Sequence, residues 1–91
     1  MNASHPMNQS RAGWARKAVE AFGSITGADL YEEAIGDLIC DVGHLCDQEG
    51  LDFLALLGGA VANWKIEQTD PDGLQNPPGV EIIIHGKTVL P

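Results

Sequence analysis

The segment from Asp29 to Asp52 constrains the fold more than any other part of the chain, because acidic and apolar residues alternate in it with a helical period. It holds eight Asp or Glu residues and no Lys or Arg. Apolar residues at spacings of three and four positions share one side of an α-helix. Those of this segment are Leu30, Tyr31, Ala34, Ile35, Leu38, Ile39, Val42, Leu45 and Cys46. The pattern predicts a folded amphipathic helix and not a disordered acidic stretch.

The acidic residues of this segment account for the charge of the whole chain. The formal net charge is −8 with the histidines neutral, and the residues before Asp29 and after Asp52 sum to zero. Such a domain repels phosphate backbones, so we expect no direct binding to nucleic acid. No apolar run is long enough to span a bilayer, and Met1–Ser10 lacks the apolar core of a secretory signal. We therefore expect a cytoplasmic protein that does not bind membranes.

A first helix is expected before the acidic segment. Ser10 can cap it, because a serine side chain accepts a hydrogen bond from the free amides of a first turn, and Gly23 can end it. Its apolar side consists of Trp14, Ala15, Ala18, Val19 and Phe22. Residues 1–9 show no periodicity and are predicted to form a flexible N-terminal tail.

Capping residues delimit the other two helices. Thr26 is the expected N-cap of the central helix and Gly50 its end. Asp52 can cap a third helix that continues to about Glu67. Its predicted buried residues are Phe53, Leu54, Leu57, Ala60, Val61 and Trp64. Two adjacent glycines, Gly58 and Gly59, weaken this helix by about 2 kcal/mol relative to alanine.

The chain changes character after the third helix. Residues 69–79 are rich in Pro, Gly and Asp and are predicted to form a linker that begins with a turn at 69–73. Residues 80–91 are expected to form a β extension, with a strand at Val80–His85 and a short return after Gly86. Because an isolated ribbon is marginal in water, it should pack on the helices or on a partner subunit. We therefore expect a mainly α protein, a three-helix antiparallel bundle at 10–68 with a short C-terminal β-strand or hairpin extension, assembled as a homodimer.

The polar side of the central helix is the candidate functional site. On a helical wheel, a stripe of about 80° contains Glu33, Asp37, Cys40, His44 and Asp47. Asp41 lies at the edge of this stripe. One interpretation is a solvated face that keeps the protein soluble. A second is a Mg²⁺ site, since Mg²⁺ takes one or two protein carboxylates together with phosphates. A third is a zinc site at Cys40 and His44.

Small residues of the central helix allow two further predictions. Cys40 and Cys46 are too far apart along one helix to form a disulfide, so both should be free thiols. Gly36 and Gly43 share one side of the helix. Either another backbone approaches there, as across a dimer axis, or small residues are simply tolerated.

The stretch from Asp37 to Phe53, Asp-Leu-Ile-Cys-Asp-Val-Gly-His-Leu-Cys-Asp-Gln-Glu-Gly-Leu-Asp-Phe, precedes a helix that runs to Trp64. It resembles small helical proteins of unknown function from bacteriophages and mobile elements, over about half of the chain. It is also similar to the MazG-type all-α nucleoside triphosphate pyrophosphatases. The positions that match this family are Glu33, Asp37, Asp41 and Asn63. The family carries acidic motifs on two neighbouring helices, whereas the first helix here has Glu20 alone, so a second subunit would have to supply the missing carboxylates.

Two functions are compatible with these residues. The favoured hypothesis is a non-catalytic acidic interaction module of a phage or mobile element, without a cofactor, such as an anti-defence or anti-CRISPR protein. Its binding residues for a basic surface of a host protein would be Glu33, Asp37, Asp41, His44 and Asp47. The alternative is a Mg²⁺-dependent, MazG-like nucleoside triphosphate pyrophosphohydrolase. In it, the carboxylates of Glu33, Asp37 and Asp41 would hold metal that bridges the phosphates and activates water.

Overall fold

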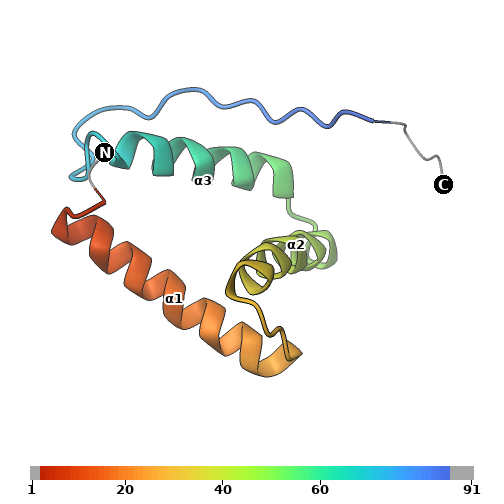
Figure 1. Cartoon of the computed structure of the whole chain (residues 1–91). Helices are drawn as coiled ribbons and strands as arrows, with labels where there is room; N and C mark the ends of the chain where they lie inside the picture. The colour runs from red at the N-terminus through yellow and green to blue at the C-terminus, as the bar shows by residue number, and fades with distance from the viewer. Residues whose placement is uncertain (1–2, 87–91) are drawn as a thin grey trace.

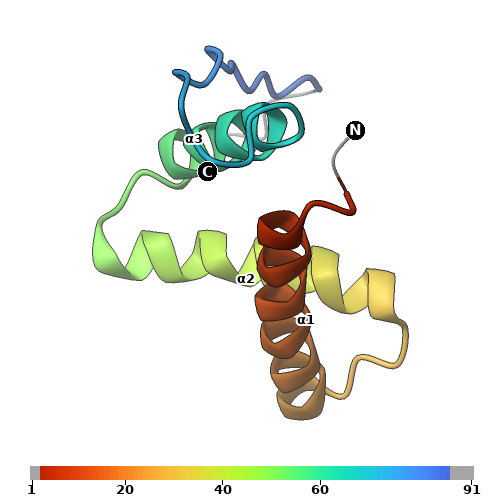
Figure 2. The same cartoon turned by 90° about the vertical axis from the view of Figure 1, so that its left-hand side faces the viewer.

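Three α-helices followed by an extended segment make up the computed structural model, which describes residues 3–86 (Figure 1). The helices are α1 at Pro6–Thr26, α2 at Tyr31–Glu49 and α3 at Phe53–Glu67. The fold is mainly α, as predicted. α1 crosses α2 steeply, and α3 lies on another side of α2 (Figure 2). The helices thus do not run side by side along their lengths, and the expected antiparallel alignment is not seen.

The start of α1 differs from the prediction. His5 is its N-cap, with Nδ1 accepting a hydrogen bond from the amide of Met7 at 3.1 Å. Pro6 follows at the first helical position, where its fixed φ favours a helix and its missing amide costs nothing. Residues 6–9 therefore belong to the helix and not to a tail, and Ser10 is not the cap. The helix ends at Gly27, with a φ of 76°, and not at Gly23.

The predicted end of α2 and start of α3 agree with the structure, but the predicted start of α2 does not. Thr26 is not the cap of α2: it lies in the last turn of α1 and its hydroxyl donates to the carbonyl of Phe22. α2 begins after Leu30 without a side-chain cap. Gly50 ends it in the left-handed conformation, with a φ of 69°. Asp52 caps α3 by accepting a hydrogen bond from the amide of Ala55 at 3.0 Å, so both of these predictions are confirmed.

The chain turns after α3 and then runs back along it in an extended conformation (Figure 1). The predicted turn is confirmed, since the amide of Gly73 donates to the carbonyl of Asp70 at 3.1 Å. Further along, a Cβ added to Gly58 would lie 3.7 Å from the carbonyl oxygen of Val80. The extension therefore packs on the helices. It contains no strand up to Gly86, because no second strand is present there to pair with it, and the expected return at 88–90 lies outside the described residues.

The interior of the molecule is small. Its buried apolar residues, within the described part, are Val19, Ala34, Cys46 and Ala62, and no large side chain is completely buried. Trp14 and Trp64, both predicted to be core residues, are 62% and 60% exposed. Gly43 is buried because the ring of Phe53 lies against it, whereas the surroundings of Gly36 are open. The close approach at Gly43 is thus made by a side chain of the same chain, and not by a backbone across a dimer axis.

Candidate functional site

The predicted site forms one exposed face of α2, here called the acidic face. Its residues are Glu33, Asp37, Asp41, His44 and Asp47, and all five are exposed. None of these five side chains makes a hydrogen bond or an ion pair in the described part of the chain. The helix holds these side chains along one side, since they are separated by three or four positions. The face therefore presents uncompensated negative charge to solvent.

Three donor atoms of different chemistry converge on this face. The Sγ of Cys40, a carboxylate oxygen of Asp41 and a ring nitrogen of His44 lie within 4.8 Å of one another. Zinc prefers sulfur and nitrogen ligands, and a structural zinc site takes four of them, whereas this group offers one sulfur and one nitrogen beside a carboxylate. The set Glu33, Asp37 and Asp41, expected for Mg²⁺, does not form a comparable group among the described residues.

The two cysteines differ in accessibility. Cys40 is exposed and Cys46 is buried, and both are free thiols as predicted. Cys46 lies on the opposite side of α2 from the polar stripe, where it is one of the few buried apolar residues. Only Cys40 is thus open to reagents or ions in solution.

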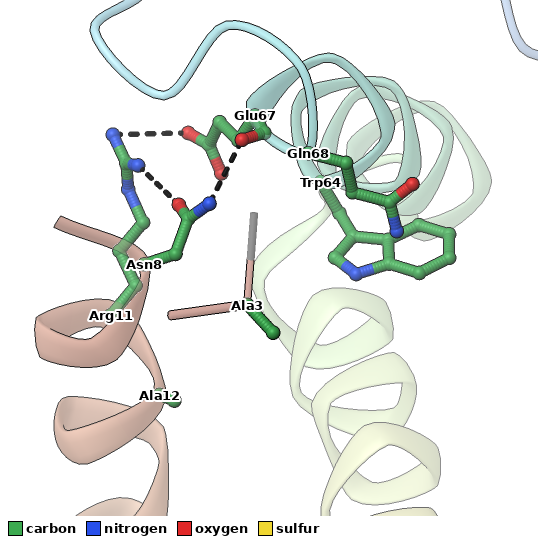
Figure 3. Close-up of a pocket in the computed structure, with 7 residues that line it drawn as sticks. All are labelled: Ala3, Asn8, Arg11, Ala12, Trp64, Glu67 and Gln68. Carbon is green, nitrogen blue, oxygen red and sulfur yellow. Dashed lines mark hydrogen bonds and ion pairs between the residues drawn. The ribbon is translucent and has the colours of Figure 1, made fainter. Parts of the chain in front are cut away.

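A cavity lies where α1 begins and α3 ends (Figure 3). Its volume is about 460 Å³, and its lining residues are Ala3, Asn8, Arg11, Ala12, Trp64, Glu67 and Gln68. Pockets of this size accommodate small ligands. No pattern in the sequence singled out this site. The His5–Pro6 pair could have indicated it, because an earlier helix start puts Asn8 and Arg11 one turn apart on a helix.

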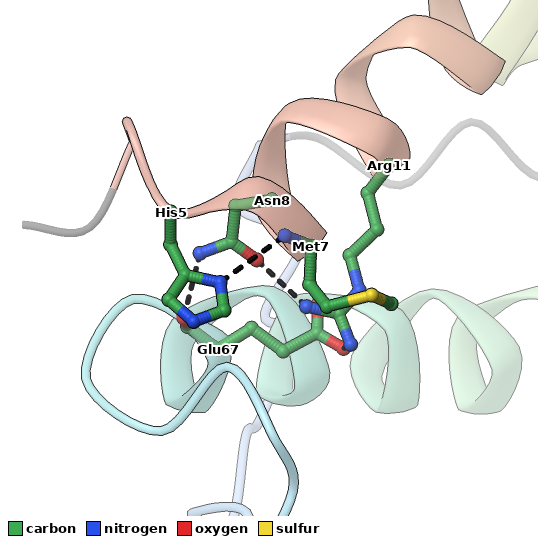
Figure 4. A network of polar contacts seen from close by, with 5 residues as sticks. All are labelled: His5, Met7, Asn8, Arg11 and Glu67. Carbon is green, nitrogen blue, oxygen red and sulfur yellow. Dashed lines mark hydrogen bonds and ion pairs between the residues drawn. The ribbon is translucent and has the colours of Figure 1, made fainter.

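Three polar residues of this cavity, Asn8, Arg11 and Glu67, are engaged with one another (Figure 4). The Asn8 amide donates to the carbonyl of Glu67 at 2.9 Å, and the Arg11 guanidinium donates to the Asn8 side-chain oxygen at 2.7 Å. A second guanidinium nitrogen of Arg11 lies 3.4 Å from the Glu67 carboxylate. The carbonyl that Asn8 reaches is among those a helix C-terminus leaves without an internal partner. The network therefore fastens α1 to the end of α3 and offers no free charged group for catalysis.

The other side of α2 is apolar and about half exposed. Its apolar face, defined by Tyr31, Ile35, Ile39, Val42 and Leu45, consists of side chains that are 40–56% exposed. Ala34 and Cys46, on the same side of the helix, are buried. Burial of such side chains is the main favourable term in folding and association. This exposure is a second departure from the predicted core, beside that of Trp14 and Trp64.

Comparisons of the chain with protein-family models, with curated proteins and with solved structures find no match. The resemblance to phage proteins and to the MazG-type enzymes thus stays a prediction. Among the described residues, no helix is both long and apolar enough to cross a membrane.

Proposed function

We propose that the protein is a non-catalytic interaction module whose acidic face binds a basic surface on another protein. The observation that supports this most directly is that all five side chains of the face are exposed and that none is paired within the described structure. They are carried by a helix, which keeps their spacing constant. A rigid array of like charge is suited to a partner of opposite charge.

The physical basis of this binding is electrostatic complementarity. Opposite potentials steer two proteins toward encounter and raise the association rate, and like charges exclude other partners. Exposed charges interact over about 8–10 Å at moderate ionic strength, so binding should weaken as salt is added. The natural partner that we propose is a host protein whose basic surface otherwise holds nucleic acid, in keeping with the resemblance to phage proteins.

The Mg²⁺-dependent alternative has less support. It needs carboxylates that converge on a metal, and among the described residues Asp41 converges with Cys40 and His44 instead of Glu33 and Asp37. It also needs a second acidic motif, for which α1 offers only Glu20. An interaction module requires neither of these.

A charge-reversal experiment tests the proposal. The immobilised protein is exposed to host lysate at low and high salt, and captured proteins are identified and measured individually by calorimetry. The triple variant D37K/D41K/D47K should lose the binding of a captured basic protein. The matched control E20K/D72K/E81K changes the net charge equally, at exposed positions outside α2. Equal binding by both variants, or capture that is indifferent to salt, would contradict the proposal.

A further inference from the structure

The surface of the chain is larger than a folded monomer of its size requires. Its accessible area is 7282 Å². A compact monomer of the same mass, 9.7 kDa, exposes about 5,100 Å². The radius of gyration is 15.3 Å, whereas about 12 Å is typical of a compact domain of this length. Both the extended segment after α3 and the exposed helix faces contribute to the excess area of about 2,200 Å².

We infer that the apolar face of α2 packs against the same face of a second copy of this chain. The exposed area favours a second copy, since obligate homodimers bury about 2,000–5,000 Å² in total, or about 1,000–2,500 Å² from each subunit. The excess area of one chain, to which the extended segment also contributes, is of the same order. Without such an interface, the helices share only four small buried apolar residues, which is little for a domain of 91 residues.

The pattern of the face fits helix-to-helix packing. The spacing alternates between four and three residues, as in the seam between two packed helices. The residues that follow it are Tyr31, Ile35, Leu38, Val42 and Leu45. Ile39 lies near the middle of the face along the helix. A two-fold axis that passes by Ile39 would bring it close to the same residue of the second copy, since an isologous interface matches one patch with itself.

The distribution of charge fits the same partner. Each copy carries a net charge of −8, so two copies repel unless their acidic residues stay apart. The acidic face and the apolar face lie on opposite sides of α2. Pairing through the apolar faces directs both acidic faces outward, which leaves them free for the partner of the proposed function. The inference does not depend on that function, because the two faces are separate.

The first experiment measures mass and stability in solution. Light scattering on a sizing column should give twice the chain mass of 9.7 kDa, and the thermal midpoint should rise with protein concentration. Ile39→Glu should abolish the dimer mass, whereas Asp37→Lys, on the acidic face, should retain it. A folded protein with the mass of one chain at all concentrations would overturn the inference, and so would a larger closed assembly.

A second experiment keeps the test decisive if Ile39→Glu does not fold. Ile39→Cys and Asp37→Cys are each made in a Cys40→Ser background and treated with a short thiol cross-linker. The Ile39→Cys protein should give covalent dimers and the Asp37→Cys protein should not. Equal cross-linking at both positions, or none at Ile39→Cys, overturns the pairing of these faces. Because neither readout involves a basic partner, failure here is distinguishable from failure of the proposed function.

Discussion

The guanidinium of Arg11, near the start of α1, lies 3.4 Å from the carboxylate of Glu67, the last residue of α3. No other ion pair joins two side chains in the described part of the chain. Asn8 bridges the same two residues through hydrogen bonds (Figure 4). Since the helices cross steeply and share little buried surface, this contact is the polar connection between the first helix and the last.

Asn8→Ala should destabilise the fold more than Arg11→Ala. The Asn8 amide satisfies a helix C-terminal carbonyl in a partly buried position, and a hydrogen bond of this kind contributes about 1 kcal/mol. The ion pair is partly exposed, and such pairs contribute about 0–1 kcal/mol, less at high salt. Urea unfolding at low and high salt measures both effects. A larger loss in Arg11→Ala that salt does not reduce would contradict this assignment.

Two glycines of α2 should respond in opposite ways to alanine. At Gly36 nothing lies within 4 Å of an added Cβ, so Gly36→Ala should stabilise the helix by about 0.5–1 kcal/mol. At Gly43 the Cβ would lie 3.1 Å from two carbons of the Phe53 ring, and overpacking costs about 1–3 kcal/mol. The free energies of unfolding, at one protein concentration, should therefore rank Gly36→Ala above Gly43→Ala. The reverse order would show that the Phe53 ring does not occupy this position.

Asp52 should matter as a cap and Thr26 should not. Asp52→Ala removes the acceptor for the amide of Ala55 and should cost about 1 kcal/mol, whereas Asp52→Asn retains an acceptor and most of the stability. The Thr26 hydroxyl bonds within its own helix, so Thr26→Ala should change the free energy of unfolding by less than Asp52→Ala. A substantial loss in Thr26→Ala would restore its predicted role as the cap of α2.

The two thiols should react at different rates with a thiol reagent. Cys40 is exposed and should be modified rapidly in the native protein, whereas Cys46 is 4% exposed and should react only as the chain unfolds. A Cys40→Ser variant should lose the fast phase and keep the slow one. Two equally fast phases in the native protein would contradict the burial of Cys46 between the helices.

Several local features were predictable from the sequence because short-range chemistry determines them. Gly50 ends α2, Asp52 starts α3 and a turn follows Asp70, as the residue types indicate. The same reasoning failed at α1, where His5 and Pro6 start the helix before Ser10 does. A histidine is an uncommon cap, and its use here depends on a side-chain rotamer that brings Nδ1 to the amide of Met7.

The candidate site was predictable in composition but not in grouping. Helical spacing placed Glu33, Asp37, Asp41 and His44 on one side of α2, and all are exposed there. It did not indicate that the donor atoms of Asp41 and His44 would converge with that of Cys40, because side-chain torsions decide which neighbours meet. The cavity between α1 and α3 joins residues far apart in the chain, so local patterns did not reveal it.

The sequence by itself determined that the protein is helical, where most of its helices end, and that its central helix has one acidic and one apolar side. These properties follow from interactions over three or four residues, which spacing alone encodes. Only the tertiary structure decided that the apolar side of α2 is left about half exposed and that Asn8, Arg11 and Glu67 connect the first helix to the last. The angles at which helices cross set how much apolar area each one covers, and those angles depend on the packing of the whole chain.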